Sequence, residues 1–180
     1  MAGGDRLISQ TAARLGKEVA TLRILGGDDL WVDPQVWRPF LRSLTHVFRN
    51  AVVHGIEDPD TRLAQGKSEA GCIECGLQLD AQQLQLSISD DGAGIDLPAL
   101  RQRAVSAGLL TATQAAGLSA QQTLELIFLD NVSTQQQVTE LAGRGVGLAA
   151  VRHEARQLKG EVTVHSLTGQ GTRLVFTLPR

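Results

Sequence analysis

Apolar and polar residues alternate strictly over 84–89, where Leu84, Leu86 and Ile88 are separated by polar side chains. A period of two residues is typical of a strand that buries one face. Short apolar runs bounded by turn residues predict five further strands, at 19–25, 30–32, 72–79, 162–166 and 173–178. The chain is therefore expected to contain a sheet, with one pair of strands near its middle and another at its end.

Apolar residues at helical spacing predict the elements between these strands. Helices are expected at 6–16, 34–54, 97–108, 119–129 and 146–158. The second of them has Asp33 as a candidate N-cap before Pro34, and Gly55 as its stop. The polar residues 57–71 leave room for one helical turn, and 130–147 has the weak periodicity of a loop.

The order of these elements predicts one domain over 6–180, with 1–5 as a linker or cloning remnant. Strands on one side and helices on the other indicate a two-layer α/β sandwich. A length of 180 residues with 42% hydrophobic residues is enough for one core. The net charge of −2 gives no reason to expect nucleic acid or an anionic membrane as a partner.

Nothing in the chain resembles a membrane span or a signal peptide, so we expect no direct membrane insertion and a cytoplasmic location. Cys72 and Cys75 form a Cys-x-x-Cys pair. Positions three apart on a strand point to opposite faces, and no second pair completes a zinc site. We therefore interpret them as two ordinary strand cysteines in a reducing compartment.

Three polar positions fall on one face of the helix predicted at 34–54. His46, Asn50 and His54 are four residues apart and span an arc of about 80°. An amide oxygen and imidazoles on that stripe can hold Mg²⁺ or its waters, and a neutral histidine can accept a proton. The alternative is that these residues cap the helix or face solvent. Three apolar neighbours on this helix are expected in the core: Val47, Phe48 and Val52.

An acidic, glycine-containing turn follows the strand at 84–89. Asp90 ends that strand and can accept a hydrogen bond from an exocyclic amine such as that of adenine. Gly92 and Gly94 would let the backbone approach the ring closely. The alternative is an ordinary turn between a strand and a helix, since Asp-Gly is a common turn pair.

A glycine-rich segment, Gly143-Arg144-Gly145-Val146-Gly147, precedes the helix predicted at 146–158. Backbone N–H groups at such a turn can bind phosphate, and Arg144 can add a forked contact. The segment lacks the dinucleotide-binding spacing, so a flexible loop before a helix is the alternative. The polar helix face, the turn after Asp90 and this glycine-rich segment together would form complementary parts of one nucleotide site.

The segments HVFRNAVVHGIEDPDTRLAQGK, SDDGAGIDLPALRQRA and LIFLDNVSTQQQVTELAGRGVGLAAV resemble the ATP-binding catalytic domain of the chemotaxis histidine kinase CheA. That domain belongs to the GHKL superfamily of gyrase, the heat-shock chaperone, histidine kinases and the mismatch-repair ATPase. The resemblance runs from about Leu15 to Pro179. It implies the Bergerat (GHKL) fold, in which a mixed, mostly antiparallel sheet carries helices on one face.

The resemblance also implies ATP and Mg²⁺ as cofactors and assigns roles to residues. Asn50 would ligate Mg²⁺, His54 would support the metal or its waters, and His46 would be the acid–base candidate near the γ-phosphate. Asp90 would accept from the adenine amine. The remaining residues implied in nucleotide binding or catalysis are Gly92, Gly94, Arg103, Ser133, Thr134, Gly143, Arg144, Gly145, Gly147 and Thr172.

The chain departs from the family in the loop at 130–147. The usual Pro-Gly-Phe-Ser-Thr-Lys segment reads Asp-Asn-Val-Ser-Thr-Gln over 130–135, so Gln135 replaces a positive charge that family members can aim at the phosphates. Charge stabilisation is the largest catalytic contribution in such chemistry, and Arg144 is the candidate to compensate. ATP binding is thus expected more firmly than efficient catalysis.

A histidine kinase also needs a phosphoacceptor histidine on a helical domain. His165 lies in a predicted strand, which disfavours it for that role. The partners implied are therefore a separate phosphoacceptor domain and a response regulator, in a parent protein that is dimeric through a domain absent here. Two other functions stay open: a pseudokinase-like ATP-binding module and, less favoured, a kinase acting on serine.

Overall fold

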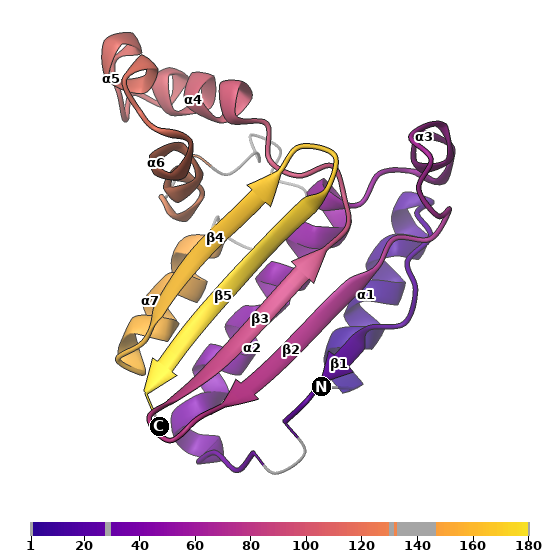
Figure 1. Ribbon diagram of the computed structural model, residues 1–180, viewed down its shortest axis with the longest axis vertical. Coiled ribbons are helices and arrows are strands. Elements are labelled where there is room, and N and C mark those ends of the chain that lie inside the picture. The colour runs from indigo at the N-terminus through magenta and orange to yellow at the C-terminus, as the bar shows by residue number, and fades with distance from the viewer. Residues whose placement is uncertain (1, 28–29, 130–131, 133–146, 180) are drawn as a thin grey trace.

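The computed structural model describes residues 2–27, 30–129, 132 and 147–179. Its five-stranded sheet has the order β1-β2-β3-β5-β4 (Figure 1). Only β1 and β2 are parallel, and the other neighbours are antiparallel. The strands are β1 (Arg23–Leu25), β2 (Ile73–Leu79), β3 (Gln83–Asp90), β4 (Glu161–Leu167) and β5 (Gly171–Pro179).

Three long helices cover one face of the sheet (Figure 1): α1 (Ala2–Leu15), α2 (Pro34–Asn50) and α7 (Leu148–Gln157). A π-helical turn, η1 (Ala51–Gly55), extends α2 to the predicted stop. The other helices of the described residues are α3 (Pro59–Ala64), α4 (Leu97–Ser106), α5 (Ala112–Ala116), α6 (Ala120–Glu125) and the 3₁₀ turn η2 (Leu126–Phe128). The predicted sandwich, with a mixed sheet and helices on one face, is confirmed.

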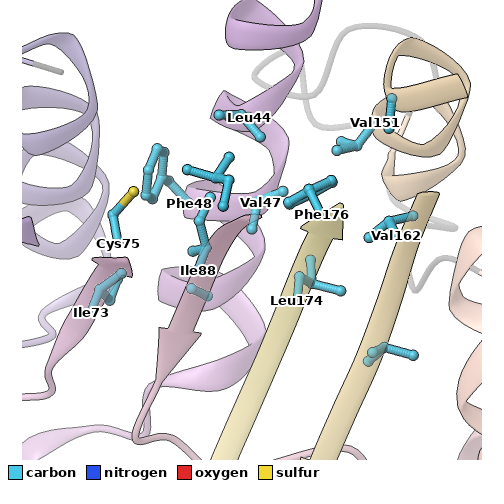
Figure 2. Packing of buried hydrophobic residues seen from close by; sticks show 14 of the residues in the cluster. Leu44, Val47, Phe48, Ile73, Cys75, Ile88, Val151, Val162, Leu174 and Phe176 are labelled. Atoms are coloured by element: carbon cyan, nitrogen blue, oxygen red, sulfur yellow. The ribbon is translucent and has the colours of Figure 1, made fainter. Parts of the chain in front are cut away.

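The main core lies between the sheet and its helical layer. Figure 2 shows Val47 and Phe48 of α2 facing Ile88 of β3 and Phe176 of β5, all of them buried. Burial of such side chains is the main favourable contribution to folding. A second, smaller cluster joins α4 to η2 and consists of Leu100, Ala104, Leu126 and Val132.

Residues 2–5 belong to α1, so their assignment to a linker was wrong. The carboxylate of Asp5 accepts a hydrogen bond from the backbone N–H of Leu22 at 3.0 Å. A Cβ added at Gly4 would lie 3.3 Å from the ring of Phe48. The small residues of this segment suggested a linker, but Gly4 packs against the core because a residue without a side chain permits close approach.

The strand predicted at 30–32 is absent, and Trp31 is 94% exposed. Three residues give too short a pattern to distinguish a strand from an extended connection. The strand predicted at 19–25 is reduced to β1 and an isolated bridge between Val19 and Gly71. Sequence reasoning also missed α5, which Thr111 begins with a capping box.

The C-terminal end of η1 is closed by a half-buried contact from a distant segment. The Lys17 ammonium donates to the carbonyl oxygens of Val52 at 2.8 Å, Val53 at 2.9 Å and Ile56 at 2.7 Å. These are carbonyls that the end of a helix otherwise leaves without partners. Lys17 therefore fixes the turn on which His54 lies.

The two cysteines are free thiols, with Cys75 buried in β2 and Cys72 directly before it. Burial raises the pKa of Cys75 to about 11 and also raises the pKa of Cys72, so both stay protonated at neutral pH. No helix in the described part of the chain combines the length and apolar character needed to cross a bilayer.

Candidate functional site

A cavity of about 350 Å³ opens where four elements meet. These are the C-terminal end of α2, the C-terminal end of β3, the N-terminal end of β5, and α4. It lies between the main core and the second cluster, because side chains of both contribute to its walls. Six of the predicted site residues line it: Asn50, His54, Asp90, Gly94, Arg103 and Thr172. Segments that are far apart in the sequence therefore meet at one site.

Asp90 is the acidic group at the inner wall of the cavity. It ends β3 and pairs with Thr172 of β5 in the sheet register. Its Oδ1 atom accepts the backbone N–H of Gly92 at 3.0 Å. Burial raises the pKa of Asp90 to about 6, so at neutral pH it is an ionised acceptor in a poorly solvated place. Such a group suits a directional hydrogen bond from a ligand amine.

The glycines beside Asp90 are required by close packing. A Cβ at Gly92 would collide with the carbonyl oxygen of Gly55, although Gly92 itself does not line the cavity. Gly94 has φ +75°, and a Cβ there would collide with the carbonyl oxygen of Leu167. Gly55 is less tightly constrained, since its Cβ would lie 3.1 Å from Asp90 Oδ1.

Ser166 of β4 links this turn to the sheet, and sequence reasoning missed it. Its hydroxyl oxygen accepts the backbone N–H of Ile95 at 2.9 Å and lies 3.0 Å from Thr172 Oγ1. The hydroxyl also donates to the carbonyl oxygen of Gly171 at 3.0 Å. Thr172 is thereby oriented at the cavity wall. A single serine in a polar strand gives no sequence signal for this role.

The helix face carries the predicted polar stripe. Asn50 and His54 line the cavity, whereas His46, one turn earlier, is half-buried and is not among the lining residues. In the described part of the chain the Asn50 side-chain amide has no hydrogen bond, so its oxygen is available to a ligand. Val47, Phe48 and Val52 are buried, as predicted.

Both histidines of the stripe favour the neutral form. The pKa of His54 is lowered first by partial desolvation and then by the positive charges of Lys17 and Arg103. The pKa of His46 is lowered by partial burial and by Arg49. A neutral imidazole can accept a proton or bind a metal.

On the opposite wall, α4 contributes Arg103 and its N-cap Asp96. The Arg103 Nε atom donates to the carbonyl oxygen of Ala99 at 3.3 Å, and Arg103 lines the cavity. Asp96 was not predicted as a lining residue, although an acidic residue before Leu-Pro is a recognisable start of a helix.

The predicted phosphate-binding segment is largely outside the described residues. This holds for Ser133, Thr134, Gly143, Arg144 and Gly145, and also for Gln135. Gly147 is described and is the N-cap residue of α7, and the next residue, Leu148, lines the cavity. Val132 is described as well, and it is buried at the cavity wall.

A partly buried ionic cluster beside the Asp90 turn was not anticipated. It consists of Glu57, Arg62, Lys67 and Asp91, and the Arg62 side chain is fully buried. Three of these residues come from 57–71, a stretch that composition alone marks as polar and solvent-facing. The signal that was available is an acidic residue with an arginine and a lysine five and ten positions later, around a short helix.

The residues of 2–27, 30–129, 132 and 147–179 contain no group of three or more His, Cys, Asp or Glu side chains arranged for a metal. A metal at this site would therefore depend on ligand oxygens in addition to Asn50 and His54. Amide oxygens with ligand phosphates suit Mg²⁺, which keeps few protein ligands. The donor set fits a metal that arrives with a nucleotide.

The mixed sheet, its single helical layer and the cavity at one end define a nucleotide-binding α/β domain. The chain belongs to the family of histidine kinase-, DNA gyrase B- and HSP90-like ATPases, whose sequence profile matches residues 41–180. This confirms the resemblance found in the motifs. The chain is accordingly an ATP-binding domain of the kind found in CheA-like histidine kinases.

Similar proteins include a gliding motility regulatory protein of Myxococcus xanthus, 39% identical over 97% of this chain and 22% of that protein. Chemotaxis protein CheA of Halobacterium salinarum is 34% identical over 97% of this chain and 26% of its own length. The chain thus spans about a quarter of these relatives. The histidine kinase domain of the Erythrobacter litoralis EL346 blue-light activated histidine kinase has the same fold, with a TM-score of 0.55 at 16% identity, covering 99% of this chain and 59% of that one.

Proposed function

We propose that this domain binds Mg·ATP and transfers the γ-phosphoryl group to a histidine on a separate phosphoacceptor domain, in cytoplasmic two-component signalling. The observation that carries the proposal is the meeting of Asn50, His54 and Arg103 with Asp90 and Thr172 in one cavity. The full parent protein would be dimeric through another domain, and a response regulator would take the phosphoryl group onward.

The base of the nucleotide would lie at the sheet end of the cavity. There Asp90 would accept from the adenine amine, and Thr172 would contact the same ring. Gly92 and Gly94 let the turn after Asp90 pack directly against the backbone carbonyls of Gly55 and Leu167, which supports Asp90 at this end of the cavity. The apolar wall next to Asp90, which includes Ile88 and Leu174, would cover the ring faces.

The phosphates would extend toward the polar stripe of α2. Asn50 and His54 would hold Mg²⁺ or its waters, and the metal would supply charge neutralisation at the phosphate oxygens. Arg103 would contact a phosphate from α4. Ser133, Thr134 and the glycines 143, 145 and 147 would enclose the chain of phosphates, with Arg144 adding positive charge.

In the transfer step, a ring nitrogen of the acceptor histidine would attack the γ-phosphorus as the bond from that phosphorus to the ADP oxygen breaks. ADP leaves with the electron pair of that bond. His46 is the candidate to take up the proton that the acceptor imidazole loses, because its lowered pKa leaves it neutral.

The direct test mixes the domain with Mg·ATP and the phosphoacceptor domain of its parent protein. The expected product is an acid-labile phosphohistidine on the acceptor. Normal ATP binding with no such product would reject the transferase function.

A second candidate is a regulatory module that binds ATP without transferring phosphate. Gln135, where the family has a lysine, is the observation that favours it. A Gln135→Lys variant distinguishes the transferase from the regulatory module. If the wild-type domain transfers no phosphoryl group and the variant does, the domain is a module that has lost catalysis.

A further inference from the structure

We propose that Arg62 and Lys67 are positioning residues for the nucleotide base. With Glu57 they form an ionic frame that holds the Asp90–Gly94 turn, and this frame sets both the affinity for adenine nucleotides and the preference for adenine over guanine. The inference rests on the proposed ATP-binding function and adds residues that do not line the cavity.

Arg62 is fully buried and uses its whole guanidinium group. Its Nη1 atom donates to Glu57 Oε2 at 3.0 Å, and its Nη2 atom donates to Asp91 Oδ2 at 2.8 Å. Nη1 also approaches the carbonyl oxygen of Asp91 at 3.3 Å. Further donors reach the carbonyl oxygens of Ser68 at 2.7 Å and Ala70 at 3.5 Å.

Lys67 binds the same turn one residue further along. Its ammonium donates to Glu57 Oε1 at 2.7 Å and to the carbonyl oxygens of Asp91 at 3.0 Å and Gly92 at 2.8 Å. These three bonds use all the donors that a lysine has. Glu57 is thus shared between the two cations. Desolvation raises the pKa of Glu57, but the hydrogen bond from Lys67 and the charges of Lys67 and Arg62 outweigh it, so the pKa is lowered overall.

Two hydrogen bonds connect Lys67 to the carboxylate that would read the base. Lys67 holds the Gly92 carbonyl oxygen, and the Gly92 N–H binds Asp90 Oδ1 at 3.0 Å. The other side of the turn is tied to the sheet, because Asp91 Oδ1 accepts the backbone N–H of Cys72 at 2.8 Å. The direction of the Asp90 carboxylate therefore depends on a turn that is fixed from both sides.

Burying charges in this way is costly, and such clusters often contribute little net stability. What a fully bonded cluster does provide is a single geometry. The local structure supports that role, because Asp58 caps α3 through the Thr61 N–H at 3.0 Å and so places Arg62 and Lys67 on the side of the turn. Arg62 lies in this short helix, and Glu57 and Lys67 lie just before and just after it.

The geometry matters for the choice of base. Adenine presents an amine at the ring position where guanine presents a carbonyl oxygen. A carboxylate held in one direction accepts from the amine and repels the carbonyl, whereas a carboxylate free to turn away repels less. Loosening the frame is expected to weaken ADP binding more than GDP binding.

The test uses Lys67→Met, which keeps the length of the side chain and removes its charge, with Lys159→Met at an exposed position as the matched control. Calorimetry with ADP and with GDP gives the two dissociation constants. Loss of charge-assisted hydrogen bonds should weaken ADP binding by about 10-fold and GDP binding by about threefold or less. In phosphotransfer assays KM for ATP should rise while kcat stays within about twofold.

A milder variant, Glu57→Gln, keeps the shape of the frame and replaces Lys67→Met in the test if that variant does not fold. It should weaken ADP binding by about threefold. Unchanged dissociation constants in a folded variant, with only a lower melting temperature, would show that the frame is structural and overturn the inference. An unsubstituted protein that binds no ADP would instead overturn the proposed function, and this inference with it.

Discussion

The two ends of the cavity are built in different ways. At the base end, Asp90 and its turn are bonded from behind by Lys67 and Arg62 and from the side by Ser166. At the phosphate end, the Asn50 amide has no hydrogen-bond partner in the described part of the chain. The proposed base end is therefore organised before a ligand arrives, whereas the Asn50 amide is left for a ligand to complete.

This difference separates two kinds of contribution. A preorganised acceptor gives affinity and selectivity because no ordering is needed on binding. Groups completed by the ligand act mainly on the charge of the phosphates, where catalysis of phosphoryl transfer resides. Substitutions at the two ends should therefore give different patterns of loss.

The largest expected effect is at the phosphate end. Asn50→Ala should abolish Mg²⁺-dependent nucleotide affinity and reduce phosphotransfer by about 1000-fold, because the proposed metal site would keep only His54 and lose its one amide oxygen. Titration of ATP with and without Mg²⁺ measures this, and Thr45→Ala, exposed on the same helix, is the control. An equal loss in the absence of Mg²⁺ would contradict the assignment to metal binding.

His46→Ala should mainly slow the transfer step, by about 100-fold, because a positioned proton acceptor contributes on this scale. ATP affinity should change little, since His46 does not line the cavity. Single-turnover phosphorylation of the acceptor domain separates the two quantities. If His46→Ala lost affinity and Asn50→Ala lost only rate, the two role assignments would have to be exchanged.

At the base end, Asp90→Asn keeps the size of the side chain and removes its charge. ATP affinity should fall by about 30-fold with or without Mg²⁺, because an ionised acceptor for the adenine amine is lost. Asp80→Asn is the matched control, since Asp80 lies in the turn at the other end of β3. A loss seen only with Mg²⁺ would place Asp90 at the wrong end of the cavity.

The fold was predictable because its largest elements have clean periodicity. The alternation of Leu84, Leu86 and Ile88 and the cap at Asp33 correspond to β3 and to the start of α2. Of the six predicted residues that line the cavity, Asn50, His54, Asp90 and Gly94 follow from local motifs, whereas Arg103 and Thr172 follow only from the resemblance to the family. Two of the failures share a cause. Residues 2–5 and 57–71 look like a linker and a polar connection by composition, and only tertiary packing shows that Gly4 abuts Phe48 and that Arg62 is buried.

The smallest predicted effect uses pH to compare the two ends. Because the pKa of Asp90 is about 6, only about a tenth of this carboxyl group is ionised at pH 5. ATP affinity should therefore fall by about 10-fold from pH 7.5 to pH 5, and Asp90→Asn should remove most of that dependence. Calorimetry at the two pH values checks this; an unchanged pH dependence in the variant would assign it to another group.

The stability of the ligand-free protein should move in the opposite direction. The folded-state pKa of Asp90 lies above its usual value of 3.8, so between about pH 4 and pH 6 the native chain binds more protons than the unfolded chain. This carboxyl group then lowers the free energy of unfolding as pH rises, by at most about 3 kcal/mol. Contributions from His46 and His54 have the opposite sign but are common to wild type and Asp90→Asn, so they cancel in the difference. Thermal melts of both proteins should show Asp90→Asn gaining stability relative to wild type from pH 4 to pH 7. This gain is expected because the wild-type protein keeps the Asp90 carboxylate ionised in a place where burial disfavours the charge.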